Sequence, residues 1–374
     1  AIMTLITSYS RMFFFLTRSD KRRLRNVLIL VATGFMMMTL MSMPDVIQTS
    51  RSSGHLHVGL GSSHFDDRRP GDQLAAPSMS PEFEERLRHG PVEADDERVM
   101  YLLRNKYLSP PSEEPYYLSG HLGPYPYQGA YLGIQPYDMF DNWMFLHKNL
   151  LRLFSKRPPG FFIEAGALDG EYLSNTLHLE KFYGWNGLLV EANPSSYAEL
   201  LKKNRRAWTS NTCLAVTTYP KEMVMEMLNV NQQIKAEVYQ AKWAIKGSSY
   251  LKADGIGAGY EQGWHKGGAF DRSYANIQCF PLVSYLKALN VTKVDLFSLD
   301  VEGAEEGILS TIPWSDVDIS VLLLEHHTNS TDKDLEFVDT MARRGYQLYD
   351  YNIADDFLGD YIFVKPEYMS SENI

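Results

Sequence analysis

The sequence predicts an α/β domain with a doubly wound, mostly parallel β-sheet over residues 160–366 and an antiparallel C-terminal strand. Two observations favour this fold class. From Phe161 onward, short apolar segments alternate with helix-like segments, which is typical of parallel strands covered by helices on both faces. The last two strand candidates, residues 347–351 and 361–364, have no obvious helix between them, which favours an antiparallel finish to the sheet.

An uncharged segment near the N-terminus predicts a membrane anchor at residues 26–44. Its apolar part, residues 27–43, would span about 26 Å as a helix at ~1.5 Å per residue, which suits an early-secretory membrane of roughly 27 Å. Six basic residues and one acid precede it, so the positive-inside rule places residues 1–25 in the cytosol and the rest in the lumen or outside. We predict a signal-anchor of a type II protein; a cleaved signal peptide and a buried core helix are the alternatives.

The segments between the anchor and the α/β domain lack a regular apolar period. Residues 45–97 are rich in Ser, Gly, Pro, Asp and Arg and are predicted to be a flexible stem. Residues 98–159 are predicted to be irregular, with a helix over 138–154 that ends before Pro158-Pro159-Gly160, and residues 367–374 form a tail. The two cysteines, Cys213 and Cys279, predict either one disulfide or two buried free thiols.

Acidic residues recur at the ends of the predicted strands. The strand candidates are residues 161–165, 187–191, 212–216, 294–299, 320–325, 347–351 and 361–364. The helix candidates among them are residues 175–182, 195–204, 282–289, 304–311 and 333–344. Ligands of such sheets bind beyond the carboxyl ends of the strands, and Glu164, Glu191, Asp300 with Glu302, and Glu325 lie at four such ends. Because acids are rarely buried without partners, these ends predict the functional site.

The segment FFIEAGALDG, residues 161–170, predicts a strand that runs into a tight turn. Gly166 and Gly170 would let the backbone turn sharply and approach a ligand closely, and the N–H groups of a helix beginning near Asn175 would point towards the same crevice. About twenty residues after the turn, Glu191 ends the next strand in LLVEANP, where an acid can accept both ribose hydroxyls of a nucleoside. An ordinary surface acid is the alternative.

These motifs resemble known methyltransferases. The pattern Glu164-x-Gly166-Ala167-x-x-Gly170 followed by LLVEANP resembles the S-adenosylmethionine-binding core of class I methyltransferases, and FSLDVEGAEEGIL resembles the signature of the FkbM family. The similarity covers residues 160–364 and implies a class I methyltransferase-like, Rossmann-like fold with S-adenosylmethionine as cofactor. The cofactor residues that it implies are Glu164, Gly166, Gly170, Glu191 and Asn193. Leu168 departs from the pattern, because many bacterial members have a small polar residue there.

The catalytic prediction rests on two strand ends. The resemblance implies that Asp300 and Glu302 lie near the methyl donor. His326, which follows Glu325, could act as a general base for an acceptor hydroxyl; the alternatives are a metal ligand together with Asp300 or Glu302 and a packing or capping cluster. The prediction places catalysis at Asp300, Glu302 and His326 and assigns no metal.

Longer stretches, among them CFPLVSYL and FSLDVEGAEEGILSTIPW, resemble the animal branch of the family that includes the membrane protein Star. This resemblance implies a lumenal domain that moves a membrane-tethered growth factor precursor, an epidermal growth factor receptor ligand, from the endoplasmic reticulum to the Golgi or endosome. The partners predicted are thus the membrane and that precursor. An active S-adenosylmethionine-dependent O-methyltransferase is the alternative, and a Golgi glycosyltransferase is a third. The net charge of −10 argues against a nucleic-acid partner.

Overall fold

The computed structural model describes residues 77–118, 137–230, 246–252, 270–327, 331–355 and 358–370. The predicted cytosolic tail, the membrane segment and most of the stem lie outside these residues. Within the described ranges, no helix is long and apolar enough to cross a membrane.

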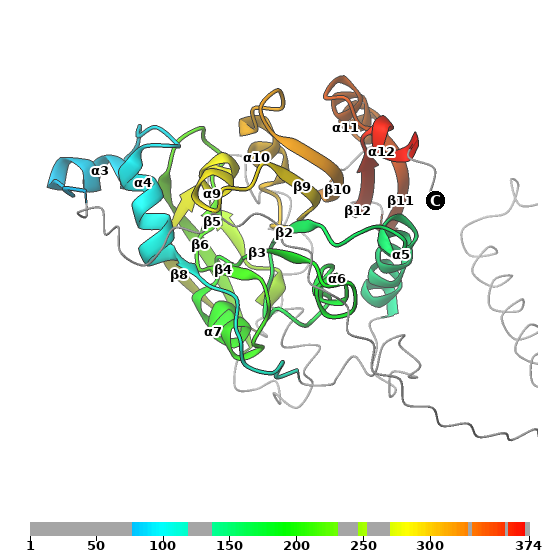
Figure 1. Ribbon diagram of the computed structural model, residues 1–374, viewed down its shortest axis with the longest axis horizontal. Helices are drawn as coiled ribbons and strands as arrows, with labels where there is room; N and C mark the ends of the chain where they lie inside the picture. The colour runs from blue at the N-terminus through cyan, green and yellow to red at the C-terminus, as the bar shows by residue number, and fades with distance from the viewer. Residues whose placement is uncertain are drawn as a thin grey trace, which may run out of the picture. The chain divides into compact units, whose positions relative to one another are not determined.

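The main sheet has eight strands in the order β1-β4-β3-β2-β9-β10-β12-β11 (Figure 1). In that order the strands are Leu108–Ser109, Trp208–Ser210, Asn186–Val190, Phe161–Ala165, Lys293–Leu299, Asp318–His327, Leu358–Val364 and Gln347–Asp355. The strands from β4 to β10 run parallel, whereas β12 is antiparallel to both β10 and β11. The predicted mostly parallel sheet with an antiparallel finish is confirmed. The strand order reverses at β2, between β3 and β9, where open α/β sheets bind ligands.

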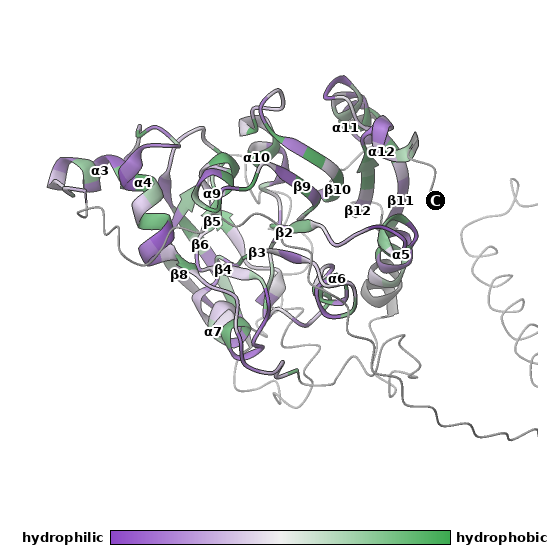
Figure 2. Cartoon of the chain, in the orientation of Figure 1, coloured by the Kyte–Doolittle hydropathy of each residue, from purple (hydrophilic) through white to green (hydrophobic). Residues whose placement is uncertain are grey.

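Helices cover both faces of this sheet. One group is α5 (Tyr137–Phe154), α6 (Leu177–Tyr183) and α7 (Pro194–Lys202), and the other is α9 (Leu282–Ala288), α10 (Glu305–Thr311) and α11 (Thr331–Arg343). Consecutive residues of β2 point to opposite faces of the sheet and so contact different groups of helices. Phe162 belongs to one hydrophobic cluster with Leu150 of α5, whereas Ile163 belongs to a second cluster with Tyr285 of α9 and Met341 of α11. Figure 2 shows hydrophobic and hydrophilic residues on the same helix in α4 and α9, as expected for helices with one buried side.

A second, four-stranded sheet has no counterpart in the sequence prediction. Its order is β5-β8-β6-β7, which are Cys213–Leu214, Phe270–Phe280, Lys221–Val230 and Tyr250–Lys252. The prediction that residues 212–216 form a strand of the main sheet is therefore wrong. The main sheet contains β4 instead, and β5, which includes Cys213 and Leu214, belongs to the second sheet. The sequence of β6, KEMVMEMLNV, is rich in residues that favour helices, and its pairing with β7 and β8 overrides that preference.

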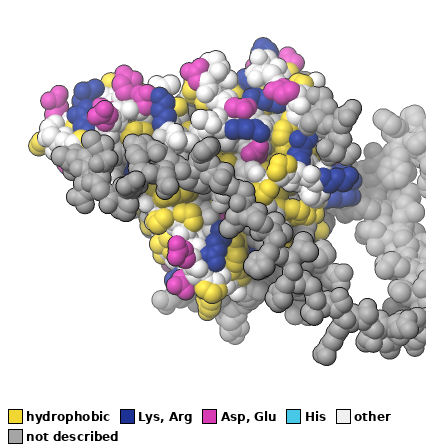
Figure 3. Space-filling model, in the orientation of Figure 1, with side chains coloured by type: hydrophobic (Ala, Val, Ile, Leu, Met, Phe, Trp, Pro, Cys, Tyr) yellow, Lys and Arg dark blue, Asp and Glu magenta, His cyan; other side chains and the backbone are white. Residues whose placement is uncertain are grey.

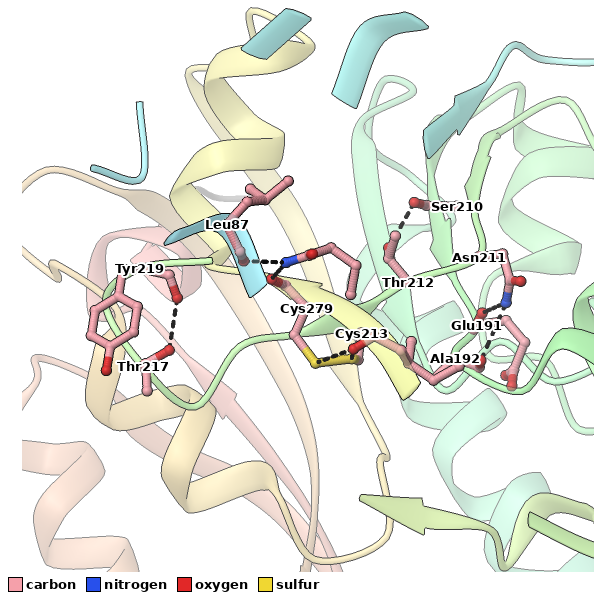
Figure 4. The surroundings of a disulfide bond; sticks show 12 residues. Leu87, Glu191, Ala192, Ser210, Asn211, Thr212, Cys213, Thr217, Tyr219 and Cys279 are labelled. Carbon is pink, nitrogen blue, oxygen red and sulfur yellow. Dashed lines mark hydrogen bonds between the residues drawn. A yellow bond between two sulfur atoms is a disulfide. The ribbon is translucent and has the colours of Figure 1, made fainter. Parts of the chain in front are cut away.

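A disulfide joins Cys213 and Cys279, 66 residues apart in the chain. The two residues lie opposite each other in the parallel pair β5–β8, and both are buried (Figure 4). Of the two alternatives that the sequence left open, the structure has the disulfide.

The segment predicted as a flexible stem contains an ordered helix at its C-terminal end. Helix α3 (Pro81–His89) is capped by Ser80, and α4 (Glu97–Leu102) follows and continues into a π-helical turn, Leu103–Tyr107. Phe83 and Leu87 are buried in the main core, so the stem prediction was wrong for these residues. The two apolar side chains form one stripe on a helix that is otherwise charged, and basic and acidic side chains are interspersed over it (Figure 3).

Candidate functional site

A cavity of about 160 Å³ lies at the carboxyl ends of β2, β3, β9 and β10. Glu164, Glu191, Asp300 and Glu325 line it from these strand ends, as predicted for the end of a parallel sheet. The second sheet supplies another part of the wall through Met225 of β6, Leu251 of β7 and residues 246–249. The cavity is smaller than the roughly 300–1,000 Å³ of most ligand pockets. A ligand as large as a nucleoside with an amino-acid tail therefore requires part of this wall to move.

The lining of the cavity is strongly acidic. Five carboxyl side chains line it, whereas Lys246 is the single cationic side chain among its described lining residues. Burial raises the pKa of Glu191 to about 7 and raises the pKa of Glu164 and Asp300. Burial, followed by the charges of Asp300 and Glu302, raises the pKa of Glu325 well above its usual range. A cation that enters this cavity would be stabilised by the carboxylates and would lower their pKa values.

Glu164 holds the loop that follows β2. Its carboxylate accepts hydrogen bonds from the Asn175 backbone N–H at 2.8 Å, from Ser174 Oγ at 2.9 Å and from Thr176 Oγ1. The next backbone N–H groups, of Thr176 and Leu177, donate to Ser174 Oγ. The N–H groups of Asn175, Thr176 and Leu177, which were predicted to point towards the crevice, are therefore bound by protein acceptors.

Glu191 lies at the cavity and keeps capacity for a ligand. Its Oε2 accepts from the Leu168 N–H and its Oε1 from the Asn193 N–H, each at 2.7 Å. A carboxylate oxygen has a second lone pair, so each can also accept a hydroxyl. Asn193 does not line the cavity: its Oδ1 accepts from the Ser195 N–H at 3.0 Å and caps α7. The structure gives Asn193 a capping position instead of the predicted contact with a cofactor.

The two glycines of the predicted turn make close contacts with protein. Gly166 has φ +85°, and a Cβ there would lie 1.8 Å from the backbone oxygen of Asp300. Gly170 has φ +75°, faces Leu200 and Arg205, and is not part of the cavity lining. Gly166 lines the cavity, but the close approach that it permits is between two loops of the chain.

Strained backbone gathers at this cavity. Leu168, Leu173 and Glu302 have φ values of +50°, +52° and +61°, in the left-handed region that non-glycine residues rarely adopt, and all three line the cavity. Such conformations cost about 1–3 kcal/mol each and occur preferentially at functional sites.

His326 does not line the cavity, so the structure does not bring it together with the other predicted catalytic residues, Asp300 and Glu302. Consecutive residues of a strand point to opposite faces, and Glu325 lines the cavity whereas His326 does not. The His326 ring stacks on Phe337 of α11 with centroids 4.0 Å apart, and its Nδ1 lies 3.5 Å from Glu306 Oε1. The side chain of His327 lies outside the described residues.

The sequence prediction omitted four polar residues at or beside the cavity, namely Asn175, Lys246, Glu305 and Asp360. Glu305 belongs to the run DVEGAEEG that signalled the family, and it accepts from the N–H groups of Val301 at 2.8 Å and Gly303 at 2.9 Å. Asp360 lies directly opposite Glu325 in the β10–β12 pair. No local pattern marks Lys246, which the turn before β7 brings to the cavity.

The sheet order, with helices on both faces and an acidic cavity at the switch point, defines a class I methyltransferase-like α/β fold with a mixed sheet. Residues 164–348 match the family model described as the Methyltransferase FkbM domain, and this part of the chain is an FkbM methyltransferase domain. The match begins at Glu164 and includes Glu191, Asp300, Glu302 and Glu325.

Two solved structures are similar to the chain. A precorrin-6Y C5,15-methyltransferase from Geobacter metallireducens GS-15 has 10% identity and a TM-score of 0.29, over 59% of this chain and 87% of that one. A TehB-like SAM-dependent methyltransferase from Corynebacterium glutamicum ATCC 13032 Kitasato has 12% identity and a TM-score of 0.28, over 61% and 96%. These values are too low to bear on the activity of this chain. No curated protein matches the sequence significantly.

Proposed function

We propose that the FkbM domain binds S-adenosylmethionine in the acidic cavity and transfers its methyl group to an oxygen of an acceptor. The observation that carries the proposal is the charge of the cavity, where five carboxyl groups and one ammonium group line the switch point of the sheet. S-adenosylmethionine carries a sulfonium and an ammonium group, and both suit a cavity of this sign.

The residues at the cavity divide into two roles. We assign the ribose hydroxyls to Glu191, because it lines the cavity and its two oxygens are held by backbone N–H groups. Asp300, Glu302 and Glu325 lie at or beyond the ends of β9 and β10, and burial raises the pKa of Asp300 and Glu325, which favours uptake of a proton by these carboxylates. The cofactor would supply an electrophilic methyl group, and one of these carboxylates would receive the proton of the acceptor's hydroxyl.

Calorimetric titration of S-adenosylmethionine into the purified full chain tests this proposal. We expect micromolar binding, and Glu191→Gln should weaken it at least tenfold because the neutral amide is a poorer acceptor for two hydroxyls. Glu199→Gln, on the exposed side of α7 where Glu199 pairs with Lys202, is the matched control and should bind as the wild type. Absence of binding by folded wild-type protein would contradict the proposal.

We also propose that the chain is a type II membrane protein whose domain lies in the lumen of the endoplasmic reticulum or Golgi, or outside the cell. The uncharged segment at residues 26–44 and its basic N-terminal flank support this orientation. The Cys213–Cys279 disulfide supports it independently, since disulfides persist mainly in oxidising compartments. Protease treatment of intact vesicles should spare the domain; its digestion would contradict a lumenal position. S-adenosylmethionine is made in the cytosol, so a lumenal enzyme requires its import.

The trafficking role rests on the resemblance to the Star branch alone. In this role the lumenal domain would escort a growth factor precursor from the endoplasmic reticulum, and catalysis would not be required. Co-precipitation of the full chain with an epidermal growth factor receptor ligand precursor is the expected result. If the precursor fails to co-precipitate while S-adenosylmethionine binds, the enzymatic account stands and the escort account does not.

A further inference from the structure

Three carboxyl groups meet beside the cavity, and two of them, Asp300 and Glu325, line it. One carboxylate oxygen each from Asp300, Glu305 and Glu325 lies within 4.8 Å of the other two. Asp300 follows β9, and Glu325 is near the end of β10, the neighbouring parallel strand. The residues that precede them, Leu299 and Leu324, lie opposite each other in this strand pair. A cation with metal–oxygen distances of 2.0–2.6 Å separates its ligand oxygens by up to about 5 Å. The three oxygens therefore already have the spacing of a coordination shell.

Burial makes this arrangement unfavourable unless the charge is neutralised. Glu305 is buried and Asp300 and Glu325 are partly buried, so three ionised carboxylates this close repel one another unless a counter-charge is present. Either protons or a cation must supply it.

The position of Glu305 is fixed by the backbone around it. Val301 N–H donates to its Oε1 and Gly303 N–H to its Oε2, at 2.8 and 2.9 Å. The intervening turn has positive φ at Glu302 and Gly303. Each oxygen of Glu305 retains a lone pair for a further ligand, so this carboxylate is held in place before a cation binds.

An independent observation comes from Asn175, which lines the same cavity and is only 8% exposed. Its Nδ2 donates to Ser298 Oγ of β9 at 3.1 Å, and Ser298 lies two residues before Asp300 in the chain. Its Oδ1 is buried and has no hydrogen-bond partner among the described residues. A buried amide oxygen without a protein partner can accept a hydrogen bond from water or contact a ligand, and amide oxygens bind hard cations directly or through their water.

We propose that Asp300, Glu305 and Glu325 bind a divalent cation, with the Asn175 amide oxygen facing the same site. Because all the donors are carboxylate or amide oxygens, the class of metal is Mg²⁺, Mn²⁺ or Ca²⁺. Binding of the cation does not depend on S-adenosylmethionine. One consequence does rest on the proposed function: a cation here would bind the acceptor's oxygen and lower the pKa of its hydroxyl.

The test is calorimetric titration of MnCl₂ into the full chain after treatment with EDTA and buffer exchange, at pH 7 and without S-adenosylmethionine. We expect one site, and proton release that appears as a dependence of the binding heat on the ionisation enthalpy of the buffer. Glu325→Gln and Asp300→Asn should each weaken binding at least tenfold. Glu306→Gln, a neighbouring residue of α10 whose side chain is 72% exposed, is the matched control and should leave binding unchanged.

Two results would overturn the proposal. One is absence of Mn²⁺, Mg²⁺ and Ca²⁺ binding at millimolar concentration by wild-type protein that shows a cooperative melting transition. The other is wild-type affinity in a folded Glu325→Gln variant. Loss of S-adenosylmethionine binding with retained Mn²⁺ binding would contradict the proposed function and leave the metal site standing.

Discussion

Replacing Asp360 with asparagine should make the protein less sensitive to alkaline pH. Asp360 is buried on β12 directly opposite Glu325. Burial, and then the charge of Asp300, raises its pKa from 3.8 to about 7. A carboxyl group whose pKa is higher in the folded state favours folding while it is protonated. Its contribution to the free energy of unfolding is therefore present below pH 3.8 and is lost as the pH rises through about 7.

The magnitude follows from the two pKa values. The difference between 3.8 and about 7 corresponds to about 4 kcal/mol, and about 2–3 kcal/mol of this is lost between roughly pH 5 and pH 8. Urea unfolding in the presence of EDTA at these two pH values measures it. Between these two pH values the free energy of unfolding should fall by about 2–3 kcal/mol less for the Asp360→Asn variant than for the wild type.

Asp339→Asn is the matched control for this measurement. Its side chain is 78% exposed on α11, so the substitution should leave the pH dependence unchanged. An Asp360→Asn variant with the wild-type pH dependence would refute the electrostatic account of the acidic strand ends.

Three further predictions concern the framework of the domain. Replacing Cys213 and Cys279 with alanine should lower the free energy of unfolding by about 4 kcal/mol, because the disulfide closes a loop across a separation of 66 residues; equal urea midpoints for variant and wild type would contradict this. Gly166→Ala should lower the free energy of unfolding by about 3 kcal/mol or more, because the added methyl group clashes with the backbone of Asp300 at a residue that already has a positive φ. Gly345 also has a positive φ, +89°, but has open space around it, so Gly345→Ala should lower the free energy of unfolding by less when both variants are unfolded with urea. Burial lowers the pKa of His178, so the wild type should lose stability as the pH falls below about 6.5. The melting temperature of the His178→Phe variant should therefore fall less than that of the wild type between about pH 6.5 and pH 4.5.

The main sheet could be predicted because its strands are buried on both faces. Residues 161–165 and 294–299 are nearly continuous apolar runs, and such runs identify buried parallel strands without any knowledge of their partners. The second sheet could not be predicted this way. Its longest strands, β6 and β8, carry Glu, Lys, Asp and Arg among their apolar residues, and only their pairing with each other makes them strands.

The site could be predicted to the level of strand ends but not of side-chain direction. Glu191 and Asp300 line the cavity because they directly follow parallel strands, and Glu302 lines it from the turn after Asp300. His326 required the register of β10, since one residue decides which face a side chain joins. Gly170 belongs to the predicted turn, but it faces Leu200 and Arg205, far away in sequence, and is not part of the cavity lining.

The most direct test of the central claim is a crystal structure of the chain with sinefungin, an S-adenosylmethionine analogue that has an amine in place of the methylated sulfur centre. The account predicts that the analogue lies in the cavity at the ends of β2, β3, β9 and β10, with its ribose hydroxyls hydrogen-bonded to Glu191. Its amine should lie beside the carboxylates of Asp300, Glu302 or Glu325. An analogue bound elsewhere on the molecule, or an empty cavity at a saturating concentration, would contradict the assignment of this cavity as the cofactor site.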